Sequence, residues 1–249
     1  MAFGKRSLAR YAARMILNHL FHFGPLDAVA LLWLFVGWWV VGRVIERPPA
    51  GKPSVSVLMR DFRKAWMVEF VTRSPRIFDG NIIGSLRQGT TFFVSATMLS
   101  IGGGIALIGN ADQLSGLARD LAQAEAPAGV WEIKILVILL FVVDAFLKFV
   151  WAHRLFGYCA ILMAAVPNDP EHPAALPRAA QAAEVNIQAA KNFNAGLRSV
   201  YFSLGALPWL LGSVPLLISA TATIYVLWRR EFASQSRMVM MRHLPGTEG

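Results

Sequence analysis

The sequence predicts an all-α protein, a polytopic membrane helix bundle with about five crossings and additional amphipathic interfacial helices. Hydrophobic residues make up 55% of the 249 residues and charged residues only 16%, whereas a soluble domain carries roughly 25% charged residues. Apolar runs long enough to cross a bilayer, which takes about 20 helical residues, recur along the chain. Lys and Arg residues gather between these runs, as the positive-inside rule expects.

Residues 1–24 predict a basic amphipathic helix at the membrane surface. Arg6, Arg10 and Arg14 recur at every fourth position and share one helical face, with apolar side chains on the other. The apolar run 26–44 follows as the first crossing.

The segment after the first crossing is polar and basic and predicts a cytoplasmic loop helix over residues 54–72. Ser54 suits the N-cap of such a helix. One side carries Val55, Leu58, Phe62, Ala65, Trp66 and Phe70, and the other carries Arg60, Arg63 and Lys64. We expect this helix to lie on the lipid surface or on the bundle.

The second crossing is predicted over residues 90–109. Ala96, Ser100 and Gly104 place a small residue at every fourth position along one stripe of this helix. Small side chains let another helix approach closely, so the stripe predicts a helix-packing face.

The third crossing, over residues 131–151, holds the candidate intramembrane polar site. Asp144 and Lys148 are four residues apart, so they share a helical face and are spaced to form an ion pair. One interpretation is a proton or ion relay, because charges inside a bilayer are costly and face the bundle interior or water. The other is that Lys148 extends to the cytoplasmic edge and neutralises Asp144.

A proline-rich stretch breaks the chain after the third crossing, and two arrangements fit the apolar residues 195–228. They form either one helix of about 30 residues or a hairpin that turns at Gly212-Ser213. The hairpin is favoured because it puts the basic tail, residues 233–249, on the side of the basic loops after crossings one and three. We therefore expect a bundle over residues 25–232, with the N-terminus outside and the C-terminus in the cytoplasm.

Four polar residues near the predicted cytoplasmic boundary are candidate contacts for lipid phosphate or a partner protein: Arg76, Asp79, Asn194 and Arg198. Capping and interfacial anchoring explain the same residues without a ligand.

The sequence contains no pattern that predicts an enzyme, a cofactor or a metal site. It lacks a phosphate-binding loop, a nucleophile elbow and a His-Glu zinc pattern. Its single cysteine, Cys159, is expected to be a small buried residue. The net charge of +9 lies in loops between apolar runs, which favours anionic lipid headgroups over nucleic acid as partner.

Six spaced segments resemble one family of bacterial and plant membrane proteins, domain of unknown function family 599. They are Arg76-Ile77-Phe78-Asp79, Phe92-Phe93-Val94-Ser95-Ala96-Thr97, Lys148-Phe149-Val150-Trp151, Phe156-Gly157-Tyr158-Cys159, Phe193-Asn194-Ala195-Gly196-Leu197-Arg198 and Arg229-Arg230-Glu231-Phe232. The resemblance covers residues 26–232 and implies a small polytopic membrane protein without an assigned activity.

Two functional hypotheses follow for a multi-pass protein of the cell inner membrane. The first is a non-catalytic accessory or scaffolding subunit of a larger membrane complex, which the small-residue stripe and amphipathic helices favour. The alternative is a small ion or solute transporter or channel that uses the Asp144/Lys148 pair.

Overall fold

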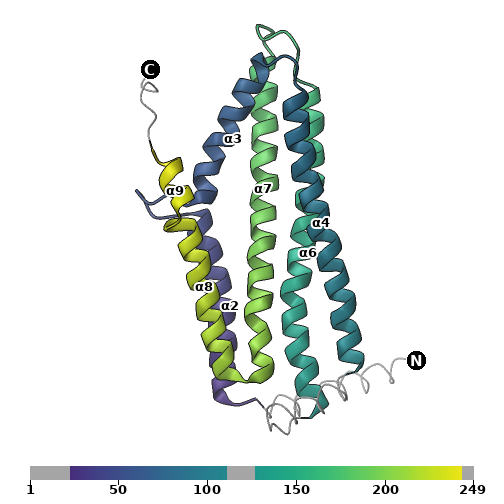
Figure 1. Ribbon diagram of the computed structural model, residues 1–249, viewed down its shortest axis with the longest axis vertical. Coiled ribbons are helices and arrows are strands. Elements are labelled where there is room, and N and C mark those ends of the chain that lie inside the picture. Colours follow the sequence, from purple (N-terminus) through teal and green to yellow (C-terminus); the bar gives the residue numbers. More distant parts are fainter. Residues whose placement is uncertain (1–22, 111–126, 243–249) are drawn as a thin grey trace, which may run out of the picture.

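The computed structural model describes residues 23–110 and 127–242, whose regular elements are all helices (Figure 1). In chain order these are α2 (Pro25–Glu46), α3 (Val55–Thr72), α4 (Ile77–Gly109), α6 (Ala128–Ala164), α7 (Ala175–Ala206), the 3-10 helix η1 (Leu207–Leu211), α8 (Ser213–Phe232) and α9 (Gln235–Met240). The predicted all-α class is confirmed for these residues. Nearly all of the predicted N-terminal helix, and the end of the tail from residue 243, lie outside the described residues.

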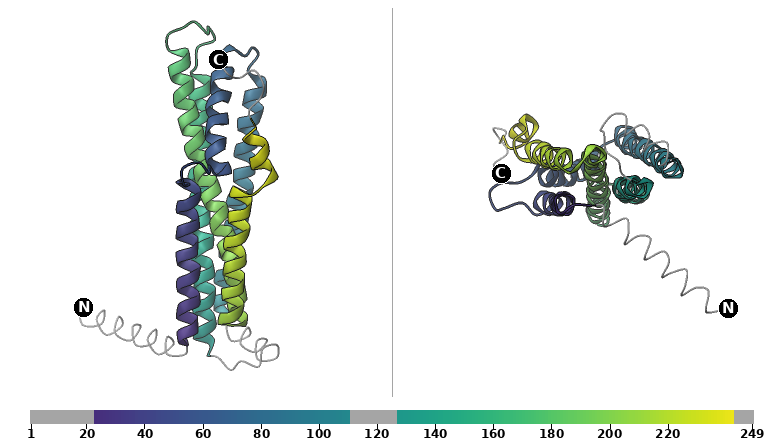
Figure 2. Two further views of the ribbon diagram at one scale, coloured as in Figure 1. Left: turned by 90° about the vertical axis from the view of Figure 1, so that its left-hand side faces the viewer. Right: turned by 90° about the horizontal axis from the view of Figure 1, so that it is seen from below.

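The helices form two stages stacked along the long axis (Figures 1 and 2). The lower stage consists of α2, α8, η1 and residues 91–109, 128–148 and 195–206. The upper stage consists of α3 and residues 77–90, 149–164 and 175–194. Helices α4, α6 and α7 pass through both stages with 33, 37 and 32 residues. At a rise of 1.5 Å per residue they are about 48–56 Å long.

Three of the described helices are long and apolar enough to cross a membrane, namely α2, α4 and α6. The sequence predicted only residues 90–109 as the second crossing, but α4 already begins at Ile77. Helix α6 likewise runs unbroken through Gly157 to Ala164. Both helices therefore extend beyond their most apolar segments.

Helix α3 has the predicted bounds and the predicted cap, because the Ser54 hydroxyl accepts a hydrogen bond from the Val57 amide at 3.2 Å. The same hydroxyl donates to the Ile45 carbonyl at 2.8 Å, which joins α3 to the end of α2. This helix was predicted to lie either on the lipid surface or on the bundle. In the structure it lies on the bundle, because α3 stands above α2 and packs along α7 (Figure 1).

The buried face of α3 differs from the predicted apolar face. Phe62 is 51% exposed, whereas Met67 and Phe70 are buried. Arg63, which the sequence assigned to the polar face, donates a hydrogen bond to the Asn186 side chain of α7. The prediction was wrong here because it assumed that a charged side chain faces water. In the bundle, Asn186 on α7 provides a hydrogen-bond acceptor, so Arg63 faces α7.

The small-residue stripe of α4 contacts α6 only in part. Gly104 faces α6 so closely that a Cβ there would lie 2.4 Å from Leu139 Cδ2. Ser100 is exposed and bonds its own helix at the Ala96 carbonyl, 2.8 Å away, and Ala96 itself is half-buried.

The chain reverses direction after η1, as the hairpin arrangement requires. Gly212 has a φ of 133°, which favours glycine, and α8 starts at Ser213. Helix α8 then packs against both α7 and α2. The Asp27 carboxylate, near the start of α2, accepts hydrogen bonds from Trp209 Nε1 at 2.7 Å and Ser213 Oγ at 2.6 Å. These bonds hold the hairpin turn against α2.

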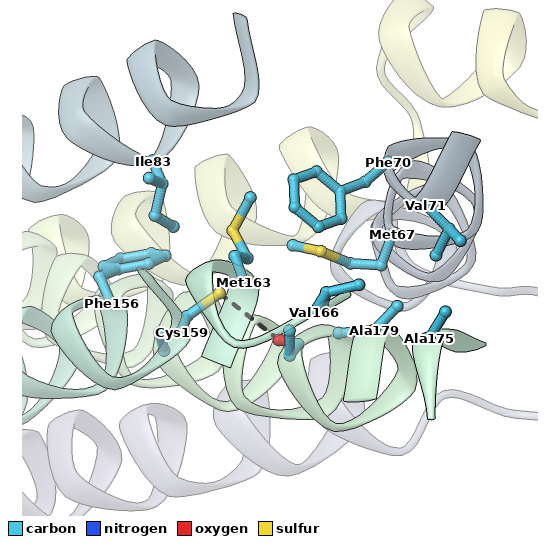
Figure 3. Packing of buried hydrophobic residues seen from close by; sticks show 13 residues of the cluster. Met67, Phe70, Val71, Ile83, Phe156, Cys159, Met163, Val166, Ala175 and Ala179 are labelled. Atoms are coloured by element: carbon cyan, nitrogen blue, oxygen red, sulfur yellow. Dashed lines mark hydrogen bonds between the residues drawn. The ribbon is translucent and has the colours of Figure 1, made fainter. Parts of the chain in front are cut away.

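Two apolar clusters fill the two stages separately. In the upper cluster, Met67 and Phe70 from α3 face Met163 from α6, and Phe156 from α6 lies beside Ile83 from α4 (Figure 3). The Cys159 thiol lies buried in this cluster, with Sγ 3.5 Å from the Ala182 carbonyl oxygen. The lower cluster contains Ala30, Leu34, Val41, Ile45, Phe141, Phe202, Ala206, Trp209, Leu216, Ala220 and Leu227. Among the described residues three charged side chains are buried, namely Asp79, Lys134 and Arg198, and of these Arg198 lies near the junction between the two clusters.

Candidate functional site

Asp144 and Lys148 form an ion pair within α6, with Lys148 Nζ 2.5 Å from Asp144 Oδ2. Two other helices contribute to it. Ser199 of α7 donates a hydrogen bond to Asp144 and accepts one from Lys148 Nζ at 3.3 Å. Trp38 of α2 donates to the same Ser199 oxygen at 3.3 Å, and Lys148 Nζ lies 5.1 Å from the centroid of the Trp38 ring. The pair is thus held by a network across three helices.

About one to two helical turns higher, the Glu46 carboxylate at the end of α2 binds three cations. Arg198 Nη2 of α7 lies 2.9 Å from Oε1, Arg60 Nη2 of α3 lies 3.0 Å from Oε2, and Lys191 Nζ lies 3.7 Å from Oε2. The Glu46 side chain is 15% exposed and that of Arg198 only 9%. Ion pairs that are this little exposed to solvent are screened by salt far less than surface ion pairs are.

These two clusters border one cleft between α2, α6 and α7, which has a volume of about 390 Å³. Its lining residues are Trp38, Trp39, Gly42, Arg43, Glu46, Arg47, Lys148, Lys191, Ala195 and Arg198. All of its charged side chains except Glu46 are cationic. The cleft therefore has the electrostatic character of an anion site.

Arg198 lines this cleft and has one unused hydrogen-bond donor. Its Nη2 binds Glu46, but its buried Nη1 has no hydrogen-bond partner among residues 23–110 and 127–242. A buried, unpaired donor on a charged group costs about 1–3 kcal/mol or more. An acceptor that reaches Nη1 would remove that cost.

A second pocket of about 260 Å³ lies on the other side of Glu46 and shares Glu46 and Lys191 with the cleft. Asn194 and Arg63 line it. Burial lowers the pKa of the Arg63 guanidinium from its ordinary value, although Asn186 accepts its hydrogen bond. Glu231 of α8 closes this pocket by binding the Ser56 amide at 3.0 Å and the Ser56 hydroxyl at 2.9 Å.

The four predicted boundary residues separate into two groups. Asn194 and Arg198 lie at the stage junction, but Arg76 and Asp79 lie at the far end of the upper stage, where α4 begins. There Arg76 donates to the Val166 and Pro167 carbonyls at 2.9 and 2.8 Å. The Asp79 carboxylate is fully buried, accepts from Trp66 Nε1 at 2.7 Å and pairs with Arg73. These contacts tie the ends of α3, α4 and α6 together.

Several residues of the cleft were missed in the sequence. Trp38 lies within the predicted first crossing and Ser199 within the apolar residues 195–228, and the spacing of residues on one helix does not connect the two. Glu46 offered a signal, since it is the only acidic residue between Val44 and Arg60, a stretch rich in Arg and Lys. An acidic residue at the basic end of a crossing indicates a structural partner nearby.

Comparison with known proteins agrees with the resemblance seen in the sequence. The model of a family described as "Protein of unknown function, DUF599" matches residues 29–236, which include every helix described above apart from the first turn of α2 and most of α9. No curated protein and no solved structure gives a significant match. With most of its length matched, this chain, which has three apolar helices of membrane-spanning length, belongs to the DUF599 family.

Proposed function

We propose that this chain is a non-catalytic inner-membrane protein with five crossings that binds an anionic ligand in the cleft between α2, α6 and α7. The observation that carries the proposal is Arg198, whose side chain is nine-tenths buried at a cation-lined cleft and keeps an unpaired donor. Nearly all buried polar groups in proteins have a hydrogen-bond partner. An anion supplies both the missing acceptor and the missing negative charge.

The dimensions and surface of the lower stage support placing it in the bilayer. Helices α2 and α8 have 22 and 20 residues, which gives about 30–33 Å, the thickness of a hydrocarbon core. The outer surface of this stage exposes large apolar side chains, among them Leu32, Trp39, Phe92, Met98, Leu99, Ile105, Leu136, Leu147, Val214 and Ile218. The upper stage then stands in the cytoplasm, and the cleft lies at the inner membrane boundary.

Five crossings make a topological prediction. Reporters inserted after Lys52, after Asp169 and after Arg237 should all be cytoplasmic, because the long helices and the α7–η1–α8 hairpin return each site to the basic side. A reporter between Gly109 and Ala128 should be exported. Paired phosphatase and fluorescent-protein fusions in intact cells measure this, and export of the reporter after Arg237 would contradict the hairpin as a pair of crossings.

Anion binding should raise the stability of the folded protein. A ligand at about 100 times its Kd adds about 2.7 kcal/mol to the unfolding free energy. We expect at least one anion from a panel of phosphate, sulfate and succinate to raise the Tm of protein purified in zwitterionic detergent. Lys191→Gln should lose most of this shift, and Arg229→Gln, which removes an exposed cation outside the cleft, should keep it. Equal shifts in both variants would contradict the site.

The transporter alternative receives less support from the packing. One helical turn below the ion pair, Phe141 stacks with Phe35 at 5.2 Å and with Phe202 at 6.2 Å between ring centroids. Phe141 and Phe202 are both fully buried, so packed apolar rings lie directly below the ion pair.

The accessory or scaffolding role is our second proposal. It is supported by large apolar side chains exposed on the upper stage, where lipid would not cover them, such as Phe62, Val68, Ile77 and Phe78. Purification from native membranes in mild detergent should then recover a stoichiometric partner, and recovery of the chain alone would contradict this role.

A further inference from the structure

We infer that the anion in the cleft is a phosphate group, and that it belongs to an organic phosphate whose remainder contacts the tryptophan wall. This inference rests on the proposed anion-binding function and narrows it to one chemical class. Its evidence is the origin of the cations on three helices, the unpaired Arg198 nitrogen, and the size and composition of the cleft.

The donors reach the cleft from three different helices. Arg43 and Arg47 come from the end of α2, Lys148 from α6, and Lys191 and Arg198 from α7. A carboxylate presents two oxygens in one plane, whereas a phosphate presents at least three acceptor oxygens arranged tetrahedrally. A tetrahedral anion therefore satisfies donors that surround it better than a planar one does.

The Glu46 carboxylate already occupies the planar pairing with guanidinium groups that a carboxylate ligand would need. Its Oε1 pairs with Arg198, and its Oε2 pairs with Arg60 and Lys191. The free Nη1 of Arg198 belongs to the same rigid guanidinium fork, and such forks are well suited to phosphate oxygens. Glu46 thus orients Arg198, and the second terminal nitrogen of this guanidinium is left without a partner.

The cleft is larger than a phosphate ion requires. Its volume of about 390 Å³ falls within the roughly 300–1,000 Å³ of small-molecule sites. Trp38, Trp39 and Gly42 form its less polar wall, and the Arg43 guanidinium lies 4.9 Å above the Trp39 ring. An anionic lipid headgroup entering at the membrane boundary and a soluble phosphate ester share the chemistry that this site recognises.

The test uses the full-length chain in phosphatidylcholine nanodiscs and follows tryptophan fluorescence. One arm adds inorganic phosphate or glycerol 3-phosphate, a second compares nanodiscs with and without phosphatidic acid, and a third adds succinate. We expect a saturable change with a phosphate probe. Arg198→Lys keeps the charge but loses the fork, and Lys191→Gln removes a half-exposed cation. Each should weaken binding about tenfold, which corresponds to about 1.4 kcal/mol. Arg229→Gln should bind as the wild type does.

The outcomes distinguish a lipid headgroup from a soluble phosphate ester, and a phosphate site from a general anion site. Saturation with phosphatidic acid alone supports a lipid headgroup, saturation with the soluble probes alone supports a free phosphate ester, and mutual competition supports both. Binding of succinate without either phosphate probe overturns the phosphate assignment but leaves an anion site. The absence of any anion binding overturns both. Unchanged phosphate binding in Arg198→Lys and Lys191→Gln, each verified as folded by its Tm, overturns the location.

Discussion

Replacing Glu46 by alanine should cause the largest loss of stability of any single substitution at the stage junction. The carboxylate is the acidic partner of Arg198, Arg60 and Lys191, and Arg198 is nine-tenths buried. Removing one member of a buried ionic cluster leaves the others uncompensated, which costs about 3–5 kcal/mol. Thermal unfolding in detergent measures the loss, together with the monodisperse fraction after size-exclusion chromatography.

A matched substitution separates burial from charge. Glu184 pairs with Lys64 at 3.5 Å, but the two side chains are 61% and 57% exposed. Glu184→Ala should therefore change the unfolding free energy by about 1 kcal/mol or less. Similar losses of unfolding free energy in Glu46→Ala and Glu184→Ala would show that Glu46 behaves as a surface charge. The cations of the cleft would then not be buried.

The sequence predicted those features whose causes lie within one helix. The class of fold follows from apolar runs of bilayer length. The start of α3 follows from Ser54, and the Asp144–Lys148 pair from its four-residue spacing. The turn before α8 follows from Gly212, whose backbone angle suits glycine. Each of these depends on residues a few positions apart.

Helix lengths were underestimated because hydropathy reports contact with lipid and not helicity. The second crossing was predicted to begin at residue 90, yet α4 already begins at Ile77. Outside the most apolar segment, packing of α3, α4, α6 and α7 around the upper cluster sustains the helices. The exposed Phe62 and the inward-facing Arg63 of α3 have the same origin, since the choice of face depends on what α7 offers.

The cleft could not be assembled from the sequence because its contacts join distant positions. Glu46 and Arg198 are 152 residues apart, and Trp38 and Ser199 are 161 residues apart. Spacing rules compare residues on one element, so Ser199 had no visible partner. Arg198 was identified as a boundary residue, but the structure shows why it matters: α7 places it between the two apolar clusters, where its charge has to be paired.

The second large effect is expected at Gly205, where α7 packs closely against α8. A Cβ at this position would lie 2.5 Å from Thr223 Oγ1 and 3.7 Å from the Ser219 carbonyl oxygen. The Thr223 hydroxyl donates a hydrogen bond to the Ser219 carbonyl at 2.8 Å, so moving it aside breaks that bond. Gly205→Val should force the helices apart and weaken the 2.6 Å bond from Ser219 Oγ to the Gly205 carbonyl. We expect a loss of about 3 kcal/mol.

Gly102→Val is the matched control, because Gly102 is exposed on α4 and a Cβ there would meet no atom within 4 Å. Valine has a slightly better helix propensity than glycine, so this variant should be neutral or a few tenths of a kcal/mol more stable. Thermal unfolding in detergent compares the two, and the reporter after Arg237 tests the topology of Gly205→Val. A neutral Gly205→Val would mean that α7 and α8 are farther apart than described. The hairpin would then lose the close packing that compensates for its short arms.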